Sequence, residues 1–86
     1  MNILFPHIDT VRFDEGPICF DALVDGTPIN CILTAPGLSA ATPVDHVISR
    51  REAFVLGQPA LREVVARRVM ESRVSPIVIT QAAFDA

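Results

Sequence analysis

Residue types that carry catalysis are scarce in this chain of 86 residues. His7 and His46 lie far apart in the sequence, and nothing around them has the spacing of metal ligands. The four glycines are isolated turn residues and do not form a phosphate-binding loop. We therefore predict no catalytic residue, no cofactor and no metal. Because a catalytic triad is spatial and can be hidden in a sequence, a small enzyme with an unrecognised site stays an alternative.

Arginine is the other source of chemistry, and its distribution along the chain is uneven. Residues 1–49 contain one arginine and six acidic residues, whereas residues 50–86 contain six arginines and four acidic residues. Phosphate groups are bound by cations that no neighbouring acid neutralises. The helical region expected at 43–73 is therefore a candidate for binding nucleic acid or another anion, through Arg51, Arg62 and Arg67.

The same arginines also have a structural explanation. Glu63, Arg67 and Glu71 follow one another at intervals of four residues, which is typical of an ion-pair ladder on a solvated helix face. Arg51 falls inside an apolar helical stripe, where arginine can bury its aliphatic stem and keep its guanidinium at the edge of the core. Since the net charge is −3 and no aromatic residue is interleaved to stack bases, the sequence disfavours nucleic acid as a partner.

A hairpin over residues 17–34 is the element that positions the remaining candidates. Asp25-Gly26 stands between two apolar runs and suits a two-residue type I′ turn, in which both residues have positive φ. This turn places Val24 opposite Thr27 and Ile18 opposite Leu33. Because side chains alternate along a strand, one face carries Ile18, Phe20, Ala22, Val24, Ile29, Cys31 and Leu33, and the other carries Cys19, Asp21, Leu23, Pro28, Asn30 and Ile32.

The hairpin register separates the two cysteines. Cys19 and Cys31 lie on adjacent strands but on opposite faces, so their Cβ atoms diverge and the thiols cannot form a disulfide. We expect Cys31 to be a small residue of the core and Cys19 to be accessible on the other face.

Further strands are predicted to extend the hairpin into an antiparallel sheet. A strand at 10–13 joins through a turn at 14–17, which places Val11 and Phe13 on the apolar face of Phe20. Residues 1–8 could add a short edge strand that ends at Pro6. Because Pro28 marks the strand 27–33 as an outer one, the β-branched run Ile77–Ile79 is expected beside 10–13 and antiparallel to 27–33.

Two helices are predicted between the last two strands. Pro36-Gly37 limits residues 34–41 to a loop or one helical turn. Thr42 and Pro43 have the types of a helix N-cap and first position, and the helix runs to about residue 56. Gly57 and Pro59 separate it from a second helix at 59–73, and one continuous kinked helix is the alternative. The expected apolar stripes are Val44, Val47, Ile48, Phe54 and Val55 in the first helix, and Leu61, Val64, Val65 and Val69 in the second.

These elements predict one α+β domain over residues 1–86. Its order is βββααβ, and its two layers are an antiparallel sheet, made of a three-strand meander and a C-terminal strand, and two helices on one face of that sheet. A chain of this length buries roughly 60–65% of its unfolded surface, which suffices for one modest core.

The landmarks of the chain resemble a family of short bacterial proteins that is known only as a domain of unknown function. The shared motifs are Ile3-x-Phe5-Pro6, Val24-Asp25-Gly26, Ile29-x-Cys31, a helical region with Phe54, and Thr80-x-x-x-Phe84. The chain departs from the family at Ala35-Pro36-Gly37, where a helix with an acidic start is usual, and at Gln58-Pro59, where an arginine is usual. The resemblance implies an α+β domain of bacterial origin and brings no catalytic residues.

The leading functional hypothesis is a non-catalytic interaction domain that binds another copy of itself, or an unidentified protein, through its open sheet face. Apolar residues on an exposed face often mark a partner surface. The stretch 1–8 lacks the features of a signal peptide, and no apolar run reaches the length of a membrane helix, so we expect a cytoplasmic protein without a membrane partner. The candidate interaction residues are Arg12, Cys19, Asp21, Leu23, Asn30 and Ile32.

Overall fold

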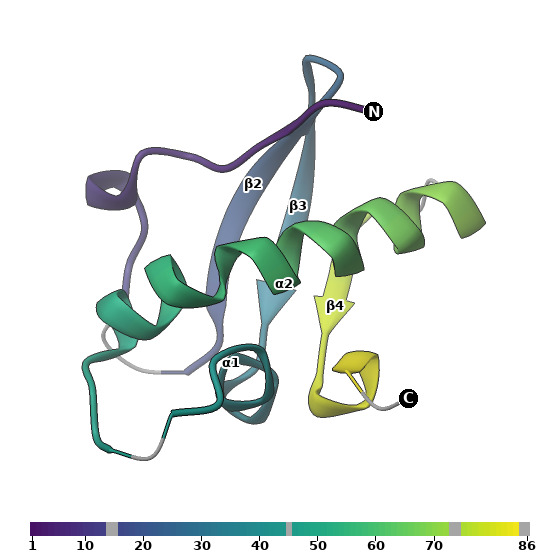
Figure 1. Cartoon of the computed structure of the whole chain (residues 1–86). Coiled ribbons are helices and arrows are strands. Elements are labelled where there is room, and N and C mark those ends of the chain that lie inside the picture. Colours follow the sequence, from purple (N-terminus) through teal and green to yellow (C-terminus); the bar gives the residue numbers. More distant parts are fainter. Residues whose placement is uncertain (14–15, 45, 73–74, 85–86) are drawn as a thin grey trace.

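The hairpin of β2 (Ile18–Val24) and β3 (Thr27–Leu33) forms the centre of the sheet. It is seen in a computed structural model that describes residues 1–13, 16–44, 46–72 and 75–84 (Figure 1). Asp25 and Gly26 have φ values of 51° and 86°, as a type I′ turn requires. Ile18 pairs with Leu33 and Val24 with Thr27, so the predicted turn and register are confirmed.

Two short strands complete a mixed sheet in the order β1-β2-β3-β4. β1 (Ile3–Leu4) is antiparallel to β2, and β4 (Ile77–Ile79) is parallel to β3. The prediction of an entirely antiparallel sheet, with the last strand beside 10–13, was therefore wrong. The inference from Pro28 holds only locally, because β4 pairs with β3 from Cys31 to Leu33, and no strand of the described residues pairs with the Pro28 end on that side.

The segment 10–13, which was predicted as a strand, lies outside the sheet. A 3₁₀ turn, η1 (Ile8–Thr10), precedes it, and β1 takes the place beside β2. β1 is held there by the hairpin tip, because the Asp25 N–H donates to the Asn2 carbonyl at 2.8 Å and the Asn2 N–H donates to the Asp25 carboxylate at 2.7 Å. Val11 is still buried and Phe13 packs on the core. The prediction that both residues contribute to the core is therefore confirmed, whereas the prediction that they lie in a strand was wrong. Residues 14 and 15 of the predicted turn lie outside the described residues.

The helical region begins earlier than expected and contains one long helix. α1 (Ala35–Ala41) starts at the N-cap Thr34, whose hydroxyl accepts from the Gly37 N–H at 3.1 Å. Pro36 is tolerated because the first N–H groups of a helix have no intrahelical partner. The predicted N-cap Thr42 is instead the C-cap of α1, and it is buried with its hydroxyl donating to the Ala53 carbonyl at 2.7 Å.

The continuous alternative is confirmed for the second half of this region. α2 (Arg50–Glu71) begins at the N-cap Ser49 and passes through Pro59 without a break. Gly57 does not end a helix; a Cβ there would lie 2.5 Å from the Thr42 hydroxyl, so glycine allows α2 to pack closely on the end of α1. Val44 and Val47 precede α2 and are exposed, so they do not form the predicted stripe.

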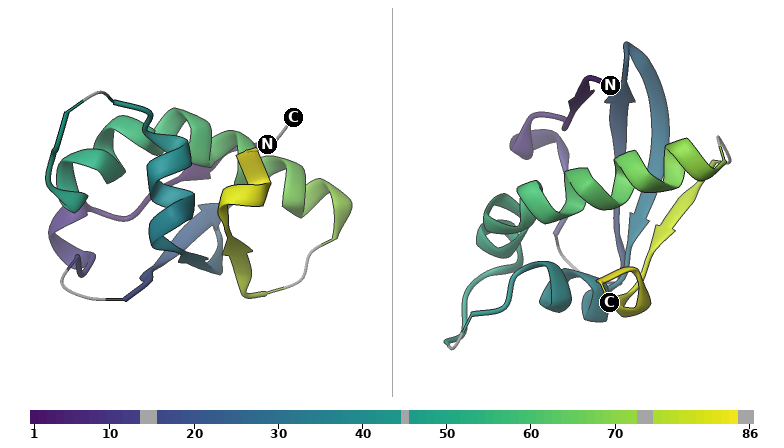
Figure 2. Two further views of the ribbon diagram at one scale, coloured as in Figure 1. Left: turned by 90° about the horizontal axis from the view of Figure 1, so that it is seen from below. Right: turned by 45° about the vertical axis from the view of Figure 1, so that its right-hand side comes forward.

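The direction of β4 follows from this single helix. Two antiparallel helices would return the chain to the end of β3, whereas one helix of 22 residues carries it across the sheet to the opposite end. Figures 1 and 2 show α2 crossing one face of the sheet, while α1 and η2 (Gln81–Phe84) lie together where β3 and β4 end.

The core lies between α2 and the face of the sheet that carries Phe20. Phe54 of α2 is fully buried and contacts three other aromatic rings, with centroid distances of 5.2 Å to Phe20, 5.6 Å to Phe13 and 6.2 Å to Phe5. The second predicted stripe is confirmed, since its members are all buried: Leu61, Val64, Val65 and Val69. We call the face packed against α2 the covered face and the opposite one the open face.

Candidate interaction surface

Three rows of side chains cross the open face, and the strand register defines them. The first row joins Leu4, Leu23 and Pro28, and the third joins Cys19, Ile32 and Val78. Both rows are apolar apart from the thiol. The middle row contains Asp21 and Asn30, and the Asn30 amide donates to the Asp21 carboxylate at 3.2 Å. The open face is thus two apolar bands with one hydrogen-bonded polar pair between them.

The structure brings together five of the six residues that the sequence assigned to this surface. Cys19, Asp21, Leu23 and Asn30 are exposed on β2 and β3, and Ile32 is half-buried among them. Arg12 is exposed but lies after η1 and outside the sheet, so its predicted place on the open face was wrong. The cause is the misplaced strand at 10–13, in which Arg12 would alternate with Val11 and Phe13 and face the open side.

Sequence reasoning missed the two apolar residues at the sides of this face. Leu4 stands beside Leu23, and Val78 stands beside Ile32. Their exposed fractions are 52% and 41%, which are high for large apolar side chains on a sheet. Because side chains alternate along a strand, Leu4 must face away from Ile3, and Val78 must face away from its two isoleucine neighbours. The sequence alone does not say which face each residue occupies, because that depends on the strands that pair with β1 and β4.

The two thiols differ as predicted. Cys31 is buried on the covered face, and its Sγ donates to the Ile29 carbonyl at 3.5 Å. Burial raises the pKa of the Cys31 thiol to about 11. Cys19 is exposed on the open face, and both cysteines are free thiols.

The candidate anion contacts do not form one cluster. Arg51 and Arg67 are separated by about 24 Å along α2, at 1.5 Å per residue. Each of the three guanidinium groups has an intramolecular contact: Arg51 binds the Asp9 carboxylate at 2.7 Å, Arg67 donates to the Ala83 carbonyl at 2.6 Å, and Arg62 lies 5.4 Å from the centre of the Phe5 ring. The hydrogen bond and charge of Arg51 lower the pKa of Asp9. These contacts favour a structural role for the arginines.

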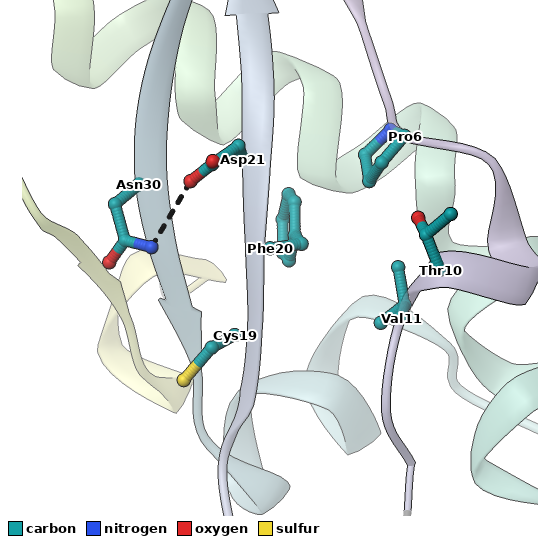
Figure 3. Close-up of a pocket in the computed structure, with 7 residues that line it drawn as sticks. All are labelled: Pro6, Thr10, Val11, Cys19, Phe20, Asp21 and Asn30. Carbon is teal, nitrogen blue, oxygen red and sulfur yellow. Dashed lines mark hydrogen bonds between the residues drawn. The ribbon is translucent and has the colours of Figure 1, made fainter.

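A cavity of about 310 Å³ lies beside β2, where β1 has ended. Figure 3 shows Phe20 pointing from β2 toward Pro6, Thr10 and Val11, whereas the side chains of Cys19 and Asp21 point away from them, that of Asp21 toward Asn30. Asn30 completes the lining from β3. We call this hollow, lined by Pro6, Thr10, Val11, Cys19, Phe20, Asp21 and Asn30, the edge groove.

The described residues hold no group of three or more His, Cys, Asp or Glu side chains placed to bind a metal ion. In the same part of the chain, no helix combines the length and the apolar character needed to cross a membrane. No family model matches the chain, and neither a curated protein nor a solved structure matches it. The resemblance to a family of short bacterial proteins therefore stays a prediction.

Proposed function

We propose that this protein is a non-catalytic interaction domain that forms a homodimer through its open face. The observation that carries the proposal is the order of the three rows, in which two apolar bands flank the Asp21–Asn30 pair. Exposed apolar patches in small proteins commonly mark contact surfaces, and most soluble oligomers are homo-oligomers with twofold symmetry.

The rows are complementary to themselves under one simple symmetry operation. A twofold axis along the strands, between β2 and β3, keeps each row opposite itself and exchanges the two strands. Apolar bands then meet apolar bands, and Asp21 of one protomer faces the partner's Asn30. An asparagine amide has two N–H donors, so Asn30 can keep its bond to Asp21 at 3.2 Å and donate a second one to the partner's Asp21. Each Asp21 carboxylate would then accept from two Asn30 amide groups, one from its own protomer and one from the partner.

The size of this face sets the expected strength of the dimer. Strands lie about 4.8 Å apart and rise about 3.3 Å per residue, so the face buries on the order of 500 Å² in each protomer. Stable interfaces average roughly 800 Å² per partner. We therefore expect a reversible dimer with a dissociation constant in the range of about 1–100 μM. The two free cysteines are consistent with a cytoplasmic location, which is part of the proposal.

Leu23→Asp tests the proposal directly. Leu23 is 40% exposed in the first apolar row, so the substitution places a charge in the interface without entering the core. We expect the wild-type protein to sediment as a concentration-dependent dimer and Leu23→Asp to remain a monomer up to several hundred micromolar. Leu56→Asp is the matched control, because Leu56 is 55% exposed and belongs to α2, the helix that covers the other face of the sheet (Figure 1).

Two results would contradict the dimer. One is a wild-type protein that stays monomeric at millimolar concentration. The other is a loss of association in Leu56→Asp together with its retention in Leu23→Asp. Circular dichroism of each variant shows whether the monomer is folded, which separates a lost interface from a lost structure.

A further inference from the structure

On the side of β2 that faces the edge groove, several backbone hydrogen-bonding positions have no strand partner among the described residues. The Asp25 N–H donates to the Asn2 carbonyl, which fixes the alternation of bonded and non-bonded positions between β1 and β2. By that alternation Leu23, Asp21 and Cys19 direct their N–H and C=O groups toward this edge. Leu4 of β1 pairs with Leu23, whereas no strand of the described chain pairs with Asp21 or Cys19 on this side.

Pro6 explains why β1 stops before these positions. Continuing the register of Leu4 with Leu23 places Pro6 opposite Asp21, and proline has no N–H to donate to the Asp21 carbonyl. The chain then turns into η1, where the Thr10 hydroxyl and N–H both donate to the His7 carbonyl, at 2.6 and 2.9 Å. Thr10, in the far wall of the groove, thus donates both of these groups to His7 and not to the edge of β2.

The groove combines this open backbone edge with an apolar interior. Phe20 and Val11, both buried members of the core, lie at its base, and Asp21 and Asn30 lie on its side toward the open face (Figure 3). Because β1 occupies the edge beside Val24 and Leu23, an added strand would pair along Asp21, Phe20 and Cys19. This is a length of three or four residues.

We propose that the edge groove binds an extended peptide segment of another protein, which adds to β2 as a short strand. Its main chain exchanges hydrogen bonds with the N–H and C=O groups of Asp21 and Cys19 and continues the sheet that Pro6 interrupts. The peptide side chain opposite Asp21 lies on the open-face side. The exposed Asp21 carboxylate favours lysine, arginine or a hydroxyl at this position of the peptide. The neighbouring side chain faces Phe20 and Val11, where a small apolar residue fits.

This site shares Asp21 with the proposed dimer surface but does not require the dimer. The dimer uses the Asp21 carboxylate with the other side chains of the open face, whereas the main chain of the peptide uses the backbone edge of β2 and the wall at residues 6–11. Peptide binding is therefore expected in the monomeric variant Leu23→Asp as well, and failure of one proposal leaves the other standing.

A library of random heptapeptides displayed on phage is the probe that tests the site. We expect selection on Leu23→Asp to enrich peptides with an alternating pattern and a basic or hydroxyl residue within it. N-methylation of a recovered peptide at every second residue should weaken binding at least tenfold for one parity and leave the other unchanged, because only alternate N–H groups face β2. The amide signals of Cys19 and Asp21 should show the largest shifts in NMR titration.

Two variants refine the test. Pro6→Val restores an N–H opposite Asp21, allows β1 to fill the edge, and should weaken the recovered peptides at least tenfold. Asp21→Asn should weaken basic peptides several-fold and leave uncharged ones unchanged. The proposal is overturned if no sequence is enriched, if N-methylation shows no parity, or if the shifted amides lie outside β2 and residues 6–11. The N-methylation result stands even if Pro6→Val does not fold.

Discussion

The two faces of the sheet are made by the same four strands, yet they differ in one row. On the covered face, Thr27 beside the turn is the one polar residue among the described strand residues, and Ile18, Phe20 and Leu33 are almost fully buried. On the open face the middle row is the polar pair of Asp21 and Asn30. The apolar side of a helix packed on that pair would remove the charged Asp21 carboxylate from water, which is costly even when one of its oxygens is hydrogen-bonded. One polar row therefore suffices to decide which face α2 covers.

The sharpest test of this difference is a matched truncation on each face of β2. Phe20→Ala removes a ring that lies 5.2 Å from Phe54 and 5.7 Å from Phe5, and we expect it to lower the free energy of unfolding by about 3–5 kcal/mol. Leu23→Ala, on the open face of the same strand, should cost less than about 1 kcal/mol in the monomer. Urea denaturation below the dimer dissociation constant measures both. Equal losses would show that the two faces are not energetically distinct.

A smaller effect is expected where α1 approaches β4. A Cβ on Gly37 would lie 2.6 Å from the Ile79 carbonyl oxygen, which is backbone and cannot move aside easily. Gly37→Ala should therefore lower the free energy of unfolding by about 1–3 kcal/mol, although alanine favours helices. Ser39→Ala, at an exposed position of the same helix, is the control and should be neutral or slightly stabilising. A stabilised Gly37→Ala would contradict the close contact.

The smallest effect is a dependence of stability on alkaline pH that separates the two thiols. The pKa of Cys31 is about 11 in the folded protein, whereas a thiol in an unfolded chain titrates near about 8.5. Above that lower value the unfolded state releases a proton that the folded state keeps, so stability falls as the pH rises from about 8.5 through 11. The chain has no tyrosine or lysine, the side chains that most often titrate in this range.

Cys31→Ala should reduce this alkaline loss relative to its own stability at pH 7, and Cys19→Ala should leave it unchanged. Thermal unfolding between pH 7 and 11 measures the difference. A thiol reagent at pH 8 adds a second readout, since it should modify one cysteine of the folded protein rapidly and the other only on unfolding. Rapid modification of both would contradict the burial of Cys31.

The sequence was sufficient to predict the hairpin because the hairpin register depends on residues that are close together in the sequence. Asp25-Gly26 favours a type I′ turn by its own conformational preferences, and that turn determines every pair from Ile18 to Leu33. The residues of β2 and β3 on the open face were therefore predicted correctly. Leu4 and Val78, at its sides, were not, because their place depends on which strands pair across the sheet.

The predicted helix boundaries were wrong because residue types that are typical of a helix start have other functions in the structure. Thr42 and Pro43 have the residue types of a helix start, but burial of Thr42 and its bond to the Ala53 carbonyl make it the end of α1. Pro59 has the type of a first helical position, yet α2 continues through it because residues on both sides pack on the sheet. The mistaken boundary then reversed β4, because only one of the two helices, α2, spans the sheet and it carries the chain to the opposite end.

The parallel pairing of β3 with β4 also implies an order of events during folding. The hairpin closes a loop of two residues, whereas Cys31 and Ile77 meet only after more than half of the chain has been ordered between them. Closing the longer loop costs more chain entropy and slows contact formation. A hairpin that forms early exposes both of its faces to the rest of the chain. The Asp21–Asn30 pair then disfavours packing of α2 on the open face, so that α2 packs on the covered face.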